Sequence, residues 1–266
     1  MTHGAEIESG GRFQFGANWA RFLANLSPAK VAAAETSLRD MLGQELAGKR
    51  LIDVGSGSGL FSLAAHRLGA TVHSIDYDPE SVACTAELRR RYAPDATNWK
   101  VEEASVLDAG YLRGLGRFDI VYSWGVLHHT GDMHLAFENI VPLVAPGGLL
   151  FVAIYNDQGW RSRYWYFVKR LYNKSTLGRI AVIASHAPFL YGGRVLARAL
   201  TGRLEVERGM NLWYDFIDWV GGYPFEVANA AAVTAFFEQR GFRLRRVRDV
   251  APRSGCNEHL FEKSHD

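Results

Sequence analysis

A glycine-rich stretch, LIDVGSGSGLF at residues 51–61, separates a short apolar run from a pattern typical of a helix. Glycine permits a tight turn and lets a ligand come close to the backbone. A helix that begins directly after such a turn offers its free N–H groups to an anion. The stretch therefore predicts a strand–turn–helix unit of the kind that binds nucleotide-like ligands in doubly wound α/β proteins.

The same alternation of strand and helix patterns continues to Tyr155. Strands separated by segments of helix length indicate parallel β-α-β units within one sheet. The expected strands are residues 50–55, 71–76, 98–104, 118–123 and 149–155, and the expected helices are residues 60–69, 79–92 and 134–148.

The two ends of the chain complete this core. An amphipathic helix is expected over residues 28–42, and residues 231–241 form a helix followed by two closing strands at 242–250 and 257–263. We expect a doubly wound, Rossmann-like sheet of seven strands, mostly parallel with an antiparallel edge strand, and a helical lid after the fifth strand. The expected units are an N-terminal helical cap (1–48), the ligand-binding core (49–155), a helical substrate lid (156–227) and the completion of the core (228–266).

Composition excludes several classes of protein. The 266 residues include 30 basic and 28 acidic side chains, and this balance implies no obligatory nucleic-acid partner. Cys84 and Cys256 have no metal-binding spacing, so no metal site is expected. The opening MTHGAEIESGGRF lacks the apolar core of a signal peptide. The longest apolar run, residues 180–191, is shorter than the roughly 20 residues of a spanning helix. We expect a cytoplasmic protein.

The glycine spacing distinguishes between nucleotide ligands. It reads D-x-G-x-G-x-G with Leu60 next, whereas dinucleotide sites carry G-x-G-x-x-G. The second expected strand ends at Asp76, whose carboxylate can accept hydrogen bonds from both hydroxyls of a ribose. A dinucleotide oxidoreductase, or a domain that binds nothing at this turn, remains the alternative.

Five motifs in order, DVGSGSG, SIDYDPESV, EEASVLD, FDIVYSWGVLHH and PGGLLFVAIY, resemble those of class I S-adenosylmethionine-dependent methyltransferases. Within that family the chain is most similar to the ubiquinone-biosynthesis-like, small-molecule branch. The resemblance covers residues 51–155 and extends through the last helix and strands to Phe261. It implies S-adenosylmethionine as methyl donor, S-adenosylhomocysteine as product, and a hydroxyl or amine of a small molecule as acceptor.

The resemblance also implies roles for individual residues in holding the donor. Asp53 would orient its ammonium group, Asp76 would hold its ribose and Tyr77 would pack on its adenine. The cationic sulfonium would be stabilised by an aromatic face, that of Trp124 or Trp19. The methionine moiety would lie along Gly55, Ser56, Gly57 and Gly59, the adenine edge at Ser105 and Val106, and the reacting centre at Ser123 and Trp124. Many relatives carry Asp in place of Ser105.

The segment YSWGVLHHTGDM, residues 122–133, follows the fourth expected strand. Members that methylate nucleobase or amide nitrogens often carry Asn/Asp-Pro-Pro-Tyr here, so this departure favours a small-molecule acceptor. Adjacent side chains point apart, so His128 and His129 are not expected to share a metal. A histidine near neutral pKa suits proton transfer. His128 and Tyr155 are the candidate catalytic residues, and the alternative for both histidines is a structural role, with His129 holding the loop or contacting substrate.

The lid begins where ligands enter a parallel sheet, beyond the carboxyl ends of its strands. Asn156 and Asp157 would face the substrate or form a turn. Trp160 is a candidate substrate contact, but the helical spacing of Trp160, Tyr164, Phe167, Val168 and Leu171 predicts packing in the core. The opposite side, Arg161, Lys169, Arg170 and Lys174, would be solvated.

Charge and the remaining polar residues suggest what the lid binds. Residues 160–210 carry ten basic side chains and two acids, a local +8 that would attract an anionic substrate or an anionic membrane surface. Candidate substrate contacts are Asp215, Trp219, Tyr223 and Asn257. Asp218 could pair with lid arginines, and Asn257 could instead belong to a surface hairpin. Alternative functions are methylation of a lipid-linked or isoprenoid acceptor at a membrane surface, RNA methylation, and donor binding without catalysis.

Overall fold

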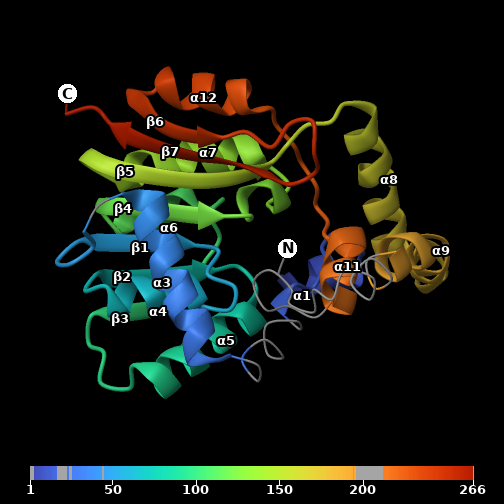
Figure 1. Cartoon of the computed structure of the whole chain (residues 1–266), viewed down its shortest axis with the longest axis horizontal. Coiled ribbons are helices and arrows are strands. Elements are labelled where there is room, and N and C mark those ends of the chain that lie inside the picture. The colour runs from blue at the N-terminus through green and yellow to red at the C-terminus, as the bar shows by residue number, and fades with distance from the viewer. Residues whose placement is uncertain are drawn as a thin grey trace.

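A computed structural model describes residues 3–16, 23, 26–43, 45–193, 195 and 212–265 of the chain. Seven strands form one sheet in the order β3-β2-β1-β4-β5-β7-β6 (Figure 1). The first five run parallel, and β7 is antiparallel to both β5 and β6. The strands are β1 (Arg50–Val54), β2 (Thr71–Asp76), β3 (Trp99–Glu103), β4 (Phe118–Trp124), β5 (Val144–Tyr155), β6 (Phe242–Arg248) and β7 (Cys256–Lys263). The predicted fold is confirmed, with the antiparallel strand one place in from the edge.

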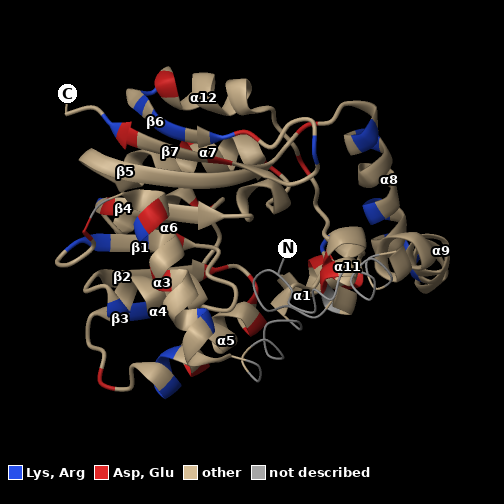
Figure 2. Cartoon of the chain, viewed as in Figure 1, with Lys and Arg blue, Asp and Glu red and all other residues tan. Residues whose placement is uncertain are grey.

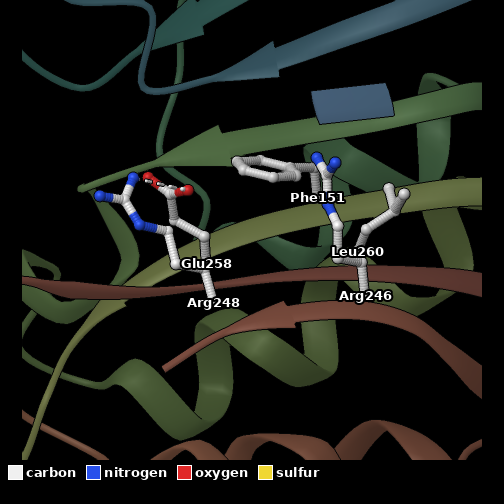
Figure 3. A pocket seen from close by; sticks show the side chains of 5 residues that line it. All are labelled: Phe151, Arg246, Arg248, Glu258 and Leu260. Atoms are coloured by element: carbon white, nitrogen blue, oxygen red, sulfur yellow. Dashed lines mark ion pairs between the residues drawn. The ribbon is translucent and has the colours of Figure 1, made fainter. Parts of the chain in front are cut away.

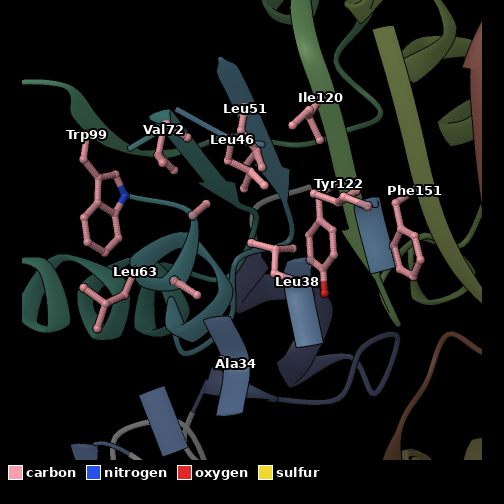
Figure 4. Packing of buried hydrophobic residues seen from close by; sticks show 14 of the residues in the cluster. Ala34, Leu38, Leu46, Leu51, Leu63, Val72, Trp99, Ile120, Tyr122 and Phe151 are labelled. Carbon is pink, nitrogen blue, oxygen red and sulfur yellow. The ribbon is translucent and has the colours of Figure 1, made fainter. Parts of the chain in front are cut away.

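Helices cover both faces of the sheet. One face carries α3 (Pro28–Leu42), α4 (Leu60–Arg67) and α5 (Pro79–Tyr92) over a core that includes Leu38, Leu51 and Tyr122 (Figure 4). The other face carries α6 (Ala109–Gly114), α7 (Met133–Ile140) and α12 (Ala230–Glu238), packed on the opposite side chains of the same strands. This arrangement explains why the central strands β1, β4 and β5 are buried along most of their length, whereas β3 and β6 are not.

The helices begin where the sequence supplies caps. Ser27 and Asp78 occupy the N-cap positions of α3 and α5, and each is followed by a proline at the first helical position. The Asp78 carboxylate accepts a hydrogen bond from the Glu80 N–H at 2.9 Å. These groups satisfy backbone donors that a helix start leaves free, so α5 starts at a fixed place after β2.

One predicted boundary is wrong. The helix expected over residues 134–148 ends at Ile140, a short 3-10 turn covers Val141–Leu143, and β5 already begins at Val144. Proline at 142 cannot continue an α-helix, so the chain leaves the helix there. The Pro-Gly-Gly stretch lies inside β5, opposite a shift in the register of β4 between Phe118 and Ile120. The short helix α6 was not expected from the sequence.

Further helices stand beyond the carboxyl ends of the parallel strands (Figure 1). They are α1 (His3–Glu8), α8 (Trp160–Lys174), α9 (Thr176–Ala187), a π-helical turn (Pro188–Gly192) and α11 (Leu212–Gly221). A third apolar cluster joins them, in which Phe13 from the N-terminal segment packs with Tyr172 of α8 and Phe216 of α11. No helix in the described ranges is long and apolar enough to cross a membrane.

The orientation of α8 reverses the expectation from its spacing. Trp160 and Phe167 are 72% and 64% exposed, and Tyr164 and Leu171 are also exposed, so only Val168 of the predicted core stripe is buried. Lys169, expected on a solvated face, is fully buried. The reason is that α8 packs on α11 with the face that carries Val168, Lys169 and Tyr172, and the aromatic core there comes from Phe13 and Phe216.

Candidate active site

The glycine turn after β1 is locked against the neighbouring strand. The N–H groups of Gly55 and Ser56 both donate to the Ile75 carbonyl at the end of β2, at 2.8 and 3.1 Å. Gly55 has a φ of 84°, and a Cβ atom there would collide with the Val126 side chain from the loop after β4. Only glycine allows this conformation and this approach, so the turn draws together the ends of three strands.

Asp76 lies at the centre of this edge. Its Oδ2 accepts a hydrogen bond from Gly57 N–H and its Oδ1 accepts one from Asp78 N–H, both at 2.9 Å. Burial raises the pKa of this carboxyl to about 6, against the lowering effect of the backbone donors. Each carboxylate oxygen has two acceptor positions, so both oxygens can still accept from a ligand hydroxyl.

Asp53 lies beneath the turn, with only 3% of its surface exposed. Its Oδ2 accepts from the Ser62 hydroxyl of α4 at 2.6 Å, and Ser62 lies 2.7 Å from the Ser74 hydroxyl of β2. Burial raises the pKa of Asp53 to about 7. The carboxyl fastens α4 to β1, and its contact with a donor ammonium group stays a prediction.

The predicted adenine and reacting-centre residues follow β3 and β4. The Ser105 hydroxyl accepts from Leu107 N–H at 3.1 Å, and Val106 is buried with its carbonyl accepting from Asn139 at 2.9 Å. Ser123 is fully buried and donates its hydroxyl to the Val54 carbonyl at 2.9 Å. Trp124 is half-buried. Trp19 lies outside the described residues.

The N-terminal segment closes over this edge of the sheet. Gly16 N–H donates to Asp78 Oδ2 at 2.7 Å, and the Tyr77 hydroxyl donates to Glu6 Oε1 at 3.2 Å. Arg12 pairs with Glu6 at 2.6 Å, and its guanidinium lies 4.9 Å from the centre of the Tyr77 ring. The segment therefore holds the tyrosine that was predicted to pack on adenine.

Arg12 also reaches the loop after β4. It donates to the carbonyls of His129 at 2.9 Å and Thr130 at 3.2 Å. One side chain thus ties α1, the end of β2 and the histidine loop together. Sequence reasoning missed Arg12 because a lone arginine in GGRFQFG carries no motif, and the two carbonyls that it reaches lie 117 and 118 residues away in the chain.

Replacing Arg12 with alanine is expected to lower the free energy of unfolding by about 2 kcal/mol. The substitution leaves Glu6 and two carbonyls without their charged donor in a partly buried site. Urea unfolding of the wild type and the variant would measure the loss. Arg12→Lys, which keeps one charge but not the forked donors, should fall between them. An Arg12→Ala variant as stable as the wild type would show that these Arg12 contacts contribute nothing to the free energy of unfolding.

The two histidines are buried in an aromatic cluster. His128 is fully buried, its ring centre lies 4.1 Å from that of Tyr155, and its Nδ1 accepts from Tyr155 N–H at 3.4 Å. His128 Nε2 has no hydrogen-bond partner among the described residues. Burial lowers the pKa of His128 well below its usual value and that of His129 to about 3, so both rings are neutral at pH 7.

His129 and Glu226 fix the loop that follows β4. The Nδ1 atom of His129 lies 2.6 Å from the Pro224 carbonyl, which is the contact expected of a loop-holding residue. Glu226 accepts from the Met133 N–H at the start of α7, at 3.0 and 3.2 Å. No group of three or more His, Cys, Asp or Glu within the described ranges could hold a metal ion.

Lys169 brings a buried amine to the same cluster. Its Nζ donates to the Trp219 carbonyl in the last turn of α11, and it lies 4.8 Å from the ring centres of both Trp219 and Phe225. Burial lowers the pKa of Lys169 to about 7, and the Asp218 carboxylate opposes this shift. The Tyr155 ring centre lies 5.7 Å from that of Trp219, so strand end and lid meet here.

The other predicted substrate contacts are dispersed. Asn156 and Asn257 are buried and joined, because Asn257 Nδ2 donates to Asn156 Oδ1 at 3.2 Å. Asp157 accepts from Gly159 N–H at 2.8 Å, which is the turn that was the alternative for it. Tyr223 and Asp215 are half-buried, and the Tyr223 ring centre lies 5.9 Å from that of Tyr166. Trp160 is exposed at the start of α8.

A cavity of about 280 Å³ opens on the sheet face beside β7 (Figure 3). Phe151 and Leu260 form its apolar wall, and Arg248 lies 3.7 Å from Glu258 at its rim. Glu258 also accepts from Trp124 Nε1 at 3.2 Å. Glu258 therefore joins this cavity to Trp124 at the end of β4.

Comparisons with known proteins agree with this geometry. Residues 29–247 match the model of a methyltransferase domain. A ubiquinone biosynthesis O-methyltransferase from Xanthomonas euvesicatoria is 34% identical over 131 residues, which is 49% of this chain and 51% of that protein. One from a Methylobacterium species is 35% identical over 127 residues, 47% of this chain and 49% of that protein. The chain spans about half the length of the curated relatives that it matches.

Solved structures share the fold at low sequence identity. Magnesium protoporphyrin IX methyltransferase from Synechocystis, with bound S-adenosylhomocysteine, is 14% identical, with a TM-score of 0.53 over 88% of this chain and 82% of that one. An S-adenosylmethionine-dependent methyltransferase from Mesorhizobium loti is 18% identical, with a TM-score of 0.52 over 86% of this chain and 98% of that one. Since the domain model covers residues 29–247, most of the chain, this protein belongs to the methyltransferase-domain family.

Proposed function

We propose that this protein transfers the methyl group of S-adenosylmethionine to a hydroxyl or amine of a small-molecule acceptor. The observation that carries the proposal is the Asp76 carboxylate, fixed by two backbone donors beside a glycine turn at the carboxyl end of β2. Ligands of open parallel sheets bind at this edge. The relatives are O-methyltransferases, which favours oxygen as the acceptor atom.

The residues present fit the donor. A ribose offers two hydroxyls to the oxygens of Asp76, and Tyr77 provides an aromatic face beside them. Gly59 has a φ of 76°, and a Cβ there would lie 2.9 Å from Thr85, so glycine is needed for the turn to pack this closely on α5. Gly55 and Gly57 would line the methionine moiety. The donor, when bound, supplies an electrophilic methyl group.

The histidine loop supplies the residue for proton transfer. A methyl acceptor must lose a proton, and a neutral imidazole can take it at the ring nitrogen that carries no proton. In His128 that nitrogen is Nδ1, because it accepts from Tyr155 N–H, so the acceptor's proton would go to Nδ1 in place of this hydrogen bond while Nε2 keeps the ring proton. Burial keeps His128 neutral by lowering its pKa, and Tyr155 packs against its ring. Lys169 packs between the Trp219 and Phe225 rings on the lid side of this cluster.

A second candidate is methylation of a lipid-linked acceptor. The exposed apolar side chains of α8, beside the exposed basic ones, favour it over an acceptor taken from water. The acceptor would then carry an apolar tail that these side chains can contact.

Isothermal titration with S-adenosylhomocysteine and, separately, with NADH tests the proposed donor. We expect S-adenosylhomocysteine to bind and NADH to give no heat of binding. Binding of NADH alone would contradict the proposal and restore the oxidoreductase alternative. Incubation with methyl-labelled donor and a panel of phenols and amines then separates an enzyme from a protein that binds the donor without catalysis.

A further inference from the structure

We propose that the hairpin formed by α8 and α9 is a docking surface for an anionic lipid bilayer. The large apolar side chains that the hairpin exposes are the first observation. On α8 they are Trp160, Tyr164, Phe167 and Leu171, and on α9 and the turn after it they are Leu177, Ile180 and Phe189. Leu177 and Phe189 are each 79% exposed. Seven such residues within thirty positions are more than scattered surface residues, and an exposed cluster of this kind marks an interaction site.

The exposed charge of the hairpin has a single sign. Arg161, Arg163, Arg170, Lys174 and Arg179 are all exposed. Residues 158–193, which the structure describes throughout, contain no Asp or Glu. Figure 2 shows the same contrast between α8, which carries only basic side chains, and α11, which carries acidic ones. A surface for another protein usually mixes charges, whereas basic side chains around apolar ones suit the anionic headgroups and acyl chains of a bilayer.

The fold gives the hairpin the rigidity and position that docking needs. The two helices are joined by the Tyr164 hydroxyl, 2.6 Å from His186 Nε2, and Val168 and Val182 are buried in the third apolar cluster. Lys169 fixes α8 to α11 from inside, so the apolar side chains are turned outward by packing. The hairpin stands clear of the sheet, beyond the carboxyl ends of the parallel strands (Figure 1).

Docking would place the proposed donor site next to the membrane. The Trp219 and Tyr155 rings connect the inner side of α8 with the strand ends, so an acceptor with an apolar tail could pass along the hairpin into the site. That route rests on the proposed methyl transfer, whereas the docking itself does not.

Cosedimentation of the whole protein with vesicles tests the docking. We expect binding to phosphatidylcholine vesicles that contain phosphatidylglycerol, weaker binding at high salt, and little binding to phosphatidylcholine alone. The double variant Trp160→Ser/Phe167→Ser should lower the partition coefficient at least tenfold, and Arg163→Gln/Arg170→Gln should lower it by roughly fivefold for each charge removed. The matched controls Leu135→Ser on α7 and Arg39→Gln/Arg113→Gln should bind as the wild type does.

Several results would overturn the inference. Wild-type protein that stays in the supernatant, or hairpin variants that bind as well as the controls, would remove it. A wild-type dimer that Trp160→Ser/Phe167→Ser converts to a monomer, without vesicle binding, would assign the surface to self-association instead. Titration of the same samples with S-adenosylhomocysteine separates the two proposals, because vesicle binding can fail while donor binding persists, and the reverse.

Discussion

Replacing Asp76 with alanine is expected to weaken the binding of S-adenosylhomocysteine by about 100-fold or more, which corresponds to about 2.7 kcal/mol. Hydrogen bonds to a charged group are worth about 1.5–3 kcal/mol each, and a ribose can make two to this carboxylate. The substitution also leaves the N–H groups of Gly57 and Asp78 without their acceptor, so the glycine turn loses its anchor. Isothermal titration of both proteins at one pH measures the effect.

Two further variants make this result specific. Asp76→Asn keeps one oxygen acceptor and the shape of the side chain. Its affinity for S-adenosylhomocysteine should therefore lie between those of the wild type and Asp76→Ala. Asp119→Ala removes a carboxylate that accepts from Arg50 N–H at 2.8 Å, at the amino ends of β1 and β4 and so at the far end of these strands from the glycine turn, and should leave donor binding unchanged. If Asp76→Ala binds S-adenosylhomocysteine as the wild type does, the ribose does not lie at Asp76.

The meeting of Asp76 with the glycine turn could be predicted, because local rules and the fold agree there. A carboxylate at the end of the second strand and glycines after the first meet in any sheet with these β-α-β units. The structure places Asp76 Oδ2 2.9 Å from Gly57 N–H, although nineteen residues separate them. The parallel direction of the first five strands followed from the same alternation, because crossover connections through helices join parallel strands. Their order in the sheet was not predicted and comes from the structure.

The lid could not be predicted to the same depth. Helix α8 offers two faces with apolar members, one through Trp160, Phe167 and Leu171 and another through Val168 and Tyr172. Spacing cannot decide between them, because the choice depends on which face meets Phe13 and Phe216 from distant parts of the chain. Lys169 lies on the inward face of α8, so a residue that the sequence pattern assigns to solvent is buried in the core. Arg12 was missed for the same reason, since its role exists only through contacts across the fold.

The buried amine of Lys169 is expected to make the free energy of unfolding strongly dependent on pH. Its pKa is lowered to about 7 in the folded protein, from an ordinary value of 10.5. Between these values the unfolded chain holds a proton on this amine and the folded chain does not. The free energy of unfolding therefore gains about 1.4 kcal/mol per pH unit from this group as pH rises through that window, and loses it again as pH falls toward 7.

Lys169→Met removes the titrating amine and nearly keeps its volume. The difference in free energy of unfolding, wild type minus variant, is expected to rise by roughly 4 kcal/mol between about pH 7 and about pH 10. Urea unfolding at several pH values measures it. At neutral pH the variant can equal or exceed the wild type in stability, because a buried charge costs more than an apolar side chain of similar size, and the lost contact with the Trp219 carbonyl opposes this gain.

Lys174→Met provides the matched control, since it removes an exposed lysine from the last turn of the same helix. Its free energy of unfolding should follow that of the wild type across the whole pH range. A Lys169→Met curve that also runs parallel to the wild type would mean that the amine reaches water, and that α8 does not pack on α11 through this side chain. A difference that grows with pH would fix the inward face of α8, and with it the outward direction of Trp160 and Phe167 on which membrane docking depends.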